Sequence, residues 1–110
     1  MAALNPKQRQ YLKGLAHPLK PILHIGKEGL TEALLHAIES AFNSRELIKV
    51  KVLDLAPESA DESGETIAGR LNGVKLVQVI GKTVVLYRRH PEKPKIQLPG
   101  KEPGGSNAVR

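Results

Sequence analysis

Apolar positions near the start of the chain recur at helical spacing. Asn5 can cap a helix and Pro6 suits its first position, so we predict a helix that ends before Pro18. The side chains expected on its buried side are Tyr11, Leu12 and Leu15, with Gln8 beside them. Arg9 and Lys13, four residues apart, share the opposite side and are expected to face water.

A short strand, a glycine-containing loop and a second helix follow. Ile22 to Ile25 form a bulky apolar run that is typical of a strand. It stops at the sequence Gly26-Lys27-Glu28-Gly29, which predicts a tight loop. Thr31 can cap the next helix, whose apolar positions lie three and four residues apart: Leu34, Leu35, Ile38, Ala41 and Phe42.

Residues 46–55 alternate between apolar and polar positions, which predicts a strand. One face carries Ile48, Val50 and Val52, and the other carries Lys49 and Lys51. The strand therefore has one core face and one partly basic face.

A third helix and a hairpin are predicted after this strand. The sequence from Ser59 to Glu62 is typical of a capping box, and a thin apolar face follows at Ile67, Ala68 and Leu71. Gly64 and Gly69 are expected to weaken this helix, which ends at residues 72–73. Two runs rich in Val, Ile and Leu, residues 76–80 and 83–88, flank the turn Gly81-Lys82 and predict a β-hairpin.

The predicted order, α-β-α-β-α-β-β, indicates an α/β two-layer sandwich, in which helices pack on one four-stranded mixed sheet. The 110 residues fit one domain, which we place at residues 1–98. The prolines and glycines of residues 99–110 predict a disordered, basic tail.

The charge of the chain is positive and unevenly distributed. Seventeen Lys and Arg residues against eleven Asp and Glu residues give a net charge of +6, and the pI is near 9.8. Residues 1–51 carry a net +4, residues 52–75 a net −3 and residues 76–110 a net +5. This segregation favours one basic binding face for a polyanion, with the acidic third helix turned away from it.

The loop at residues 26–29 is the first candidate binding site. Glycine has no Cβ, so the backbone can approach a ligand closely, and the helix start behind it offers N–H groups and a positive dipole end. Both features suit a phosphate. With ten glycines in the chain, about one pair at this spacing is expected by chance. A connecting turn without a ligand therefore remains the alternative from these residues alone.

Other chemistries find little support in the sequence. The absence of cysteine excludes disulfides and thiolate chemistry. No nucleophile motif or metal-ligand spacing is present, so we expect no catalytic residue, metal, cofactor or small-molecule substrate. The four histidines are scattered, and His24 and His36 are interpreted as structural or surface residues. The apolar runs are too short to cross a membrane and no secretory signal is visible, so we expect a cytoplasmic protein.

The three aromatic residues, Tyr11, Phe42 and Tyr87, are too few for a sheet that stacks on bases. Recognition of a nucleic acid would therefore depend on its backbone and shape.

Four segments together resemble the bacterial YhbY family, the stand-alone form of the CRM domain (chloroplast RNA splicing and ribosome maturation). They are residues 12–21, 26–31 (GKEGLT), 46–51 (ELIKVK) and 78–88 (QVIGKTVVLYR), and the similarity extends over residues 4–98. The resemblance implies an RNA-binding domain with a fold similar to the C-terminal domain of bacterial translation initiation factor three. It also implies that the glycine loop acts like that of KH domains, and that the partner is a precursor of the large ribosomal subunit. Plant members usually have two basic residues between the glycines, whereas the second here is Glu28, so backbone amides are expected to contribute more than side chains.

We therefore predict a monomeric, non-catalytic RNA-binding protein that acts in ribosome biogenesis on precursor large-subunit ribosomal RNA. The predicted RNA-binding residues are Gly26, Lys27, Glu28 and Gly29 in the loop, and Lys20, Lys49, Lys51, Lys82, Arg88 and Arg89 around it. An alternative from another class is a protein-interaction module whose basic face docks on acidic ribosomal or assembly proteins.

Overall fold

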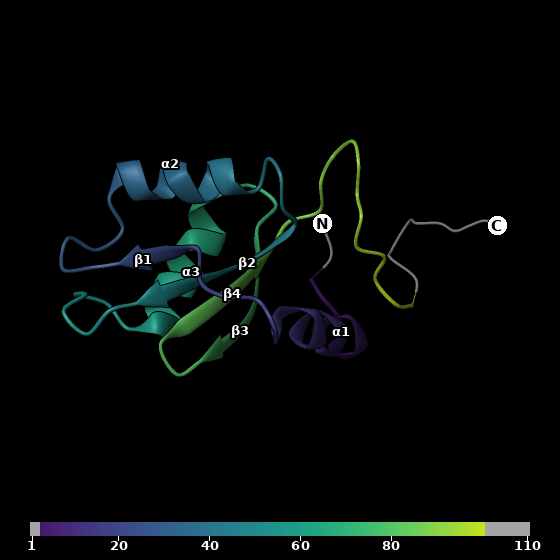
Figure 1. Cartoon of the computed structure of the whole chain (residues 1–110), viewed down its shortest axis with the longest axis horizontal. Helices are drawn as coiled ribbons and strands as arrows, with labels where there is room; N and C mark the ends of the chain where they lie inside the picture. The colour runs from purple at the N-terminus through teal and green to yellow at the C-terminus, as the bar shows by residue number, and fades with distance from the viewer. Residues whose placement is uncertain (1–2, 101–110) are drawn as a thin grey trace.

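The computed structural model describes residues 3–100 and packs three helices on a four-stranded sheet (Figure 1). The helices are α1 (Pro6–Ala16), α2 (Glu32–Ala41) and α3 (Ala60–Arg70). The strands are β1 (Leu23–Ile25), β2 (Leu47–Val52), β3 (Lys75–Ile80) and β4 (Thr83–Tyr87). The predicted α/β sandwich and its element order are confirmed, with strand ends that differ by one to three residues. Most of the predicted tail, residues 101–110, lies outside the described residues.

The sheet has the strand order β1-β2-β4-β3 and is mixed. β1 runs parallel to β2, whereas β4 pairs antiparallel with both β2 and β3. Parallel strands need a crossover connection, which α2 supplies between β1 and β2. Antiparallel strands can be joined by a tight turn, as β3 and β4 are.

The three helices begin at capping residues, as the sequence predicts. Asn5 and Ser59 each form a capping box, with Gln8 and Glu62 as the respective partners. The Thr31 hydroxyl accepts a hydrogen bond from the backbone N–H of Leu34 at the start of α2. These side chains fix where each helix starts, and so where each connecting loop ends.

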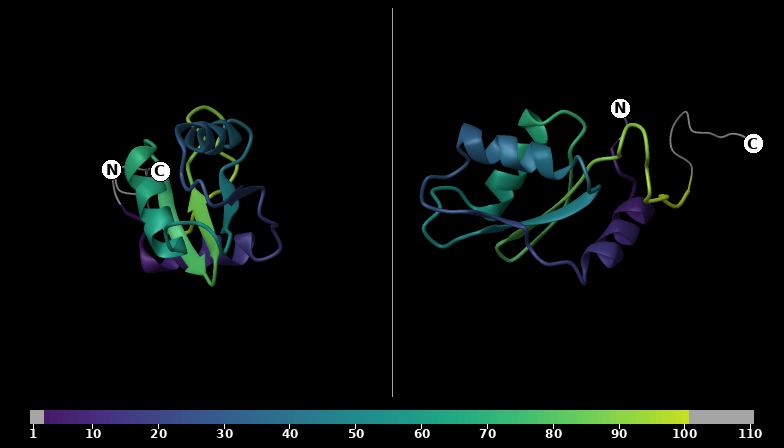
Figure 2. Two further views of the ribbon diagram at one scale, coloured as in Figure 1. Left: turned by 90° about the vertical axis from the view of Figure 1, so that its left-hand side faces the viewer. Right: turned by 45° about the horizontal axis from the view of Figure 1, so that its top comes forward.

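The larger core lies between the sheet and the pair α2 and α3, which share one face of the sheet (Figure 2). Its fully buried side chains include Ile25, Ile38, Ile48, Val50, Ile67, Val84 and Leu86. Gly64 lets α3 approach the sheet closely, because a Cβ there would lie 2.9 Å from Leu76 Cδ1 and 3.1 Å from Val84 Cγ1. The glycine predicted to weaken α3 is therefore required by its packing.

The smaller core lies on the opposite face, where α1 covers only one end of the sheet. Leu12 and Ala16 of α1 pack against Leu47, Val77, Val85 and Tyr87. Leu12 is buried as predicted, but Tyr11 and Leu15 are 43% and 38% exposed, so their predicted burial is wrong. The buried stripe of α1 is narrower than the sequence suggested, because the helix touches only one end of the sheet.

The prediction that Arg9 faces water is also wrong. Its Nη1 donates hydrogen bonds to the backbone oxygens of Leu76 and Val77, at 2.7 and 2.6 Å. A β-bulge between Leu76 and Gln78 disturbs the ladder at this point of β3. Bulges leave backbone groups without their ladder partner, and the guanidinium supplies one here.

The segment after β4 has no regular structure but is held in place by Glu46. The carboxylate of Glu46 is buried and accepts hydrogen bonds from the backbone N–H groups of His90, Lys95 and Ile96. Burial raises the pKa of this carboxyl, but the three N–H donors and the nearby His90 outweigh it, so the pKa of Glu46 is lowered overall. Ile96 and Leu98 then pack against the smaller core.

Among the described residues, no helix has the length and apolar character needed to cross a membrane.

Candidate nucleic-acid interface

The glycine loop (residues 26–29) is a tight turn between β1 and α2. The backbone N–H of Gly29 donates to the oxygen of Gly26 at 2.9 Å, which places Lys27 and Glu28 at an exposed tip. Gly29 has a φ of +73° and is buried, and a Cβ there would lie 3.0 Å from Pro57 Cγ. Gly29 is therefore required by the fold itself. At Gly26 the nearest atom to an added Cβ is Leu53 Cδ1, at 4.0 Å, so this position has room.

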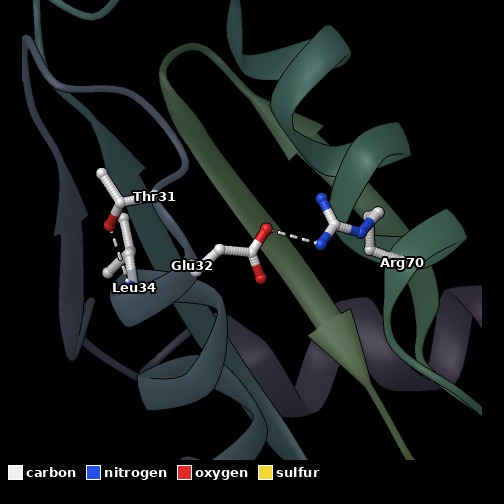
Figure 3. A network of polar contacts seen from close by, with 4 residues as sticks. All are labelled: Thr31, Glu32, Leu34 and Arg70. Carbon is white, nitrogen blue, oxygen red and sulfur yellow. Dashed lines mark hydrogen bonds and ion pairs between the residues drawn. The ribbon is translucent and has the colours of Figure 1, made fainter.

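Groups of the chain itself already satisfy part of the hydrogen-bonding capacity and the positive dipole at the start of α2. Thr31 caps the helix, and the backbone N–H of Thr31 donates to the oxygen of Gly29 at 3.1 Å. Glu32 places its carboxylate in the first turn and pairs with Arg70 of α3 at 2.7 Å (Figure 3). Within residues 3–100, the N–H groups of Lys27 and Glu28 carry no hydrogen bond. The N–H groups of Glu32 and Ala33 in the first turn of α2 carry none either within that range, so the donors open to a phosphate lie at the tip of the turn and at the start of α2.

Half of one sheet face lies open next to this loop. The register places His24, Lys51, Thr83 and Ile80 in one row across β1, β2, β4 and β3. These residues alternate with the core residues Ile25, Val52 and Val84, so they lie on the face opposite α2 and α3. Since α1 packs at the other end of this face, His24, Lys51 and Ile80 remain exposed.

Backbone hydrogen bonds bring three predicted lysines to the same end of the sheet. The N–H of Leu53 donates to the oxygen of Ile25 at 2.8 Å, and the N–H of Val52 donates to the oxygen of Lys82 at 2.7 Å. The end of β2 therefore lies between the glycine loop and the β3–β4 turn, at the left of Figure 1. We call this region, with Lys27, Lys51 and Lys82, the loop end of the sheet.

An acidic group lies within the loop end. Lys82 forms an ion pair with Asp54, and this hydrogen bond, followed by the Lys82 charge and a smaller effect of Lys51, lowers the pKa of the Asp54 carboxyl. A hollow of about 350 Å³ beside it is lined in part by Asp54, Glu58, Asp61 and Lys82. The segment between β2 and α3, with the first turn of α3, therefore brings acidic groups to the loop end, although α3 packs on the face of the sheet opposite Lys51.

Lys49 lies in the middle of β2 and already has backbone partners. Its Nζ donates to the backbone oxygens of His17 and Leu19, at 3.3 and 2.9 Å, on the face that carries α1. Lys20 is exposed in the segment that leads from there into β1. Lys49 therefore fixes this segment and is not placed at the loop end.

Arg88 and Arg89 lie at the far end of β4, away from the glycine loop. Arg88 pairs with Glu39 of α2 at 2.9 Å and donates to the oxygen of Asn72 at 3.4 Å. Its guanidinium also lies 5.5 Å from the centre of the Phe42 ring. These contacts give Arg88 a structural role, whereas Arg89 remains exposed. The predicted site residues thus divide between the two ends of the sheet.

His24 lies exposed on the open face, in agreement with its interpretation as a structural or surface residue, but its place beside Lys51 was not predicted from the sequence. The signal was the alternation of β1, in which Leu23 and Ile25 pack toward the core while His24 points the other way. Among the residues the structure describes, no group of three His, Asp or Glu side chains could hold a metal ion.

Comparison with known proteins gives a consistent result over nearly the whole chain. An "RNA-binding protein" of Haemophilus influenzae is 46% identical over 101 residues, covering 92% of this chain and 100% of its own length. "Probable RNA-binding protein YqeI" of Bacillus subtilis is 38% identical over 96 residues, covering 87% and 99%. The solution structure of SAV1595 from Staphylococcus aureus superposes with a TM-score of 0.74 at 42% identity, covering 87% of this chain and 99% of that one. Residues 4–88 match the model of the CRS1 / YhbY (CRM) domain, and the chain belongs to this family.

Proposed function

We propose that the chain binds RNA through the loop end of the sheet and acts in ribosome biogenesis on precursor large-subunit ribosomal RNA. The observation that supports it best is that the free N–H groups of Lys27 and Glu28 lie at the same end of the sheet as the exposed lysines Lys51 and Lys82. N–H donors and ammonium groups are the partners that a phosphate backbone uses. The relatives that carry the name RNA-binding protein support the choice of ligand.

In this proposal the tip of the glycine loop contacts one phosphate, and the RNA strand runs from there along the open face of the sheet. His24, Lys51 and Thr83 supply polar contacts along the row that crosses the sheet. The aliphatic Ile80 at the edge of this row offers no ring for base stacking, so contacts are mainly with phosphate and sugar. Binding is then weakly selective for sequence and strongly dependent on salt.

Gly26 gives a cleaner test of the loop than Gly29. Replacing Gly29 with Asp would strain a backbone with φ +73° and press a side chain against Pro57, so a loss of binding could reflect a damaged fold. Gly26→Asp places a carboxylate beside the turn without such a clash, and Gly26→Ala is its matched control. We expect the Asp variant to bind a fragment of large-subunit ribosomal RNA about tenfold more weakly, because like charges repel across an interface. The Ala variant should bind as the parent chain does. Equal affinity for both variants would exclude the loop from the site.

The identity of the RNA is tested by cross-linking in cells. Ultraviolet cross-links to the full chain, mapped by sequencing, should be concentrated on precursors of large-subunit ribosomal RNA. Cross-links spread over transfer and messenger RNA would contradict the ribosomal part of the proposal and leave the loop end as a general RNA site.

A further inference from the structure

A groove of about 520 Å³ lies at the opposite end of the molecule from the glycine loop. We call it the α1 groove. Its lining includes Leu15 and Leu19, at and after the end of α1, which we call its first wall, and His90, Lys93, Lys95 and Ile96, after β4, which we call its second wall. Arg45, Glu46 and Leu47, where the chain enters β2, also line it. The glycine loop follows β1 beside the end of β2, whereas residues at the start of β2 line the α1 groove. Figure 1 shows these two ends of β2 apart from each other.

Two charged side chains of β2 and its entry fix both walls of the groove. Lys49 donates from Nζ to the oxygens of His17 and Leu19 and so holds the first wall. Glu46 accepts from the N–H groups of His90, Lys95 and Ile96 and so holds the second. A groove whose walls are already ordered loses little conformational entropy when it is filled.

The surface of the groove combines exposed aliphatic side chains with positive charge. Leu15 and Leu19 are 38% and 39% exposed, which leaves apolar area uncovered on one wall. Arg45, Lys93 and Lys95 are exposed around the groove, whereas the single carboxylate, that of Glu46, is buried under three N–H donors. The field at the mouth is therefore positive, and one wall of the groove is apolar.

We propose that the α1 groove binds an acidic segment of another protein that carries aliphatic or aromatic side chains between its carboxylates. The apolar side chains fill the space between Leu15, Leu19 and Ile96, and the carboxylates face Arg45, Lys93 and Lys95. RNA is the poorer occupant, because the exposed aliphatic side chains of Leu15 and Leu19 offer nothing to a phosphate or a sugar, and no Phe, Tyr or Trp lines the groove. The proposal does not depend on the RNA site, and both sites can be filled at once.

The test uses the full chain labelled with ¹⁵N and a synthetic peptide in which Leu or Phe recurs every third or fourth position among Glu and Asp. We expect the backbone signals of Leu19, Leu47, His90 and Ile96 to shift on titration. A peptide with Lys in place of every Glu and Asp should shift none of them. Shifts confined to other regions, or no shift at the groove at about 1 mM acidic peptide, would overturn the proposal.

Variants separate the apolar from the charged part of the groove. Leu19→Ser should weaken peptide binding about tenfold, or about 1.4 kcal/mol, whereas Leu55→Ser, at an exposed leucine remote from the groove, should leave it unchanged. The double variant Lys93→Glu with Lys95→Glu should weaken binding about tenfold at low salt and less at high salt. Binding that is unaffected by these variants would contradict the assignment.

Two further results would assign the groove to another occupant. If deletion of residues 101–110 raised peptide affinity, the end of this chain would be the occupant. If a twelve-nucleotide single-stranded RNA shifted the same signals and displaced the peptide, the groove would belong to the RNA interface. Under the proposal the deletion has no effect, and RNA binding at the loop end persists in the Leu19→Ser variant.

Discussion

Replacing Glu46 with Gln tests how the irregular segment after β4 is held. Glu46 is 7% exposed, and its carboxylate accepts three backbone hydrogen bonds, from His90 at 2.8 Å, Lys95 at 2.9 Å and Ile96 at 2.8 Å. Oε1 accepts two of them and Oε2 accepts one. Gln has the same shape but only one oxygen, and its NH₂ group would face at least one N–H donor.

The expected loss of stability follows from these three bonds. A hydrogen bond to a charged group contributes roughly 1.5–3 kcal/mol, and one between neutral groups roughly 0.5–1.5 kcal/mol. In the Glu46→Gln variant two bonds become neutral, at a loss of about 1–1.5 kcal/mol each, and one is lost, which sums to about 3.5–6 kcal/mol. Since the segment lies at the surface and can take up water, we expect a net loss of about 2–3 kcal/mol in the free energy of unfolding. For a domain of this size that lowers Tm by about 10–20 °C.

Urea unfolding and amide hydrogen exchange measure the effect. Exchange at Lys95 and Ile96 should become faster in Glu46→Gln, because their N–H groups lose a charged acceptor. Glu65→Gln, at an exposed position of α3, is the matched control and should change stability by less than about 0.5 kcal/mol. A Glu46→Gln variant as stable as this control, with unchanged exchange at both amides, would refute the reasoning.

The same variant also has a pH signature. Because the pKa of Glu46 is lowered on folding, its stabilisation is present above the pKa of the unfolded chain and is lost as the pH falls through the folded value. The parent chain should therefore lose stability in acid more steeply than Glu46→Gln does. Equal slopes of stability against pH in the acid range would contradict this.

Other contacts make further predictions. Arg88→Met should lower the free energy of unfolding by about 1–2 kcal/mol, measured in urea, because it removes an ion pair and a cation–π contact; no loss would argue against a structural role. Gly29→Ala should destabilise by about 1–2 kcal/mol, since φ is +73°, whereas Gly26→Ala should change stability by less than about 0.5 kcal/mol; equal effects would contradict the geometry. Lys82→Ala should raise the pKa of Asp54, followed by its carboxyl NMR shift, and an unchanged titration would show that the ion pair is absent in solution.

The fold was predictable because its signals are local. Capping residues such as Thr31 and Ser59, the apolar periodicity of α2 and the alternation of β2 each specify an element within a few residues. The prediction of the sheet face on which Lys51 lies is also correct, because the alternation of side chains along β2 determines that face. The resemblance to the YhbY family added the expected likeness to the C-terminal domain of bacterial translation initiation factor three.

The roles of several charged residues could not be predicted, because their partners are remote backbone groups. Arg9 meets carbonyl oxygens exposed by a bulge in β3, and Glu46 meets N–H groups more than forty residues away. Alternation correctly places Lys49 on the same face of β2 as Lys51. Whether α1 and the segment after it reach Lys49 depends on packing, which alternation does not predict. A prediction from the charge pattern treats every such side chain as available for RNA, although these already form hydrogen bonds with backbone groups.

The salt dependence of RNA binding tests the loop end most directly. Two triple variants provide the comparison, one at the loop end and one at exposed lysines elsewhere. The control changes Lys7, Lys93 and Lys95 to Ala, so that both variants lose the same net charge. Circular dichroism on each variant confirms that the fold is retained.

The decisive variant changes Lys27, Lys51 and Lys82 to Ala, with affinity for a large-subunit ribosomal RNA fragment followed by fluorescence anisotropy over a range of salt concentrations. Each phosphate contact contributes about 0.7–0.9 to the slope of log K against log salt. Our account predicts a slope smaller by about 2 in this variant and unchanged in the control. Equal slopes in the parent chain and the loop-end variant would contradict the proposal that RNA binds there.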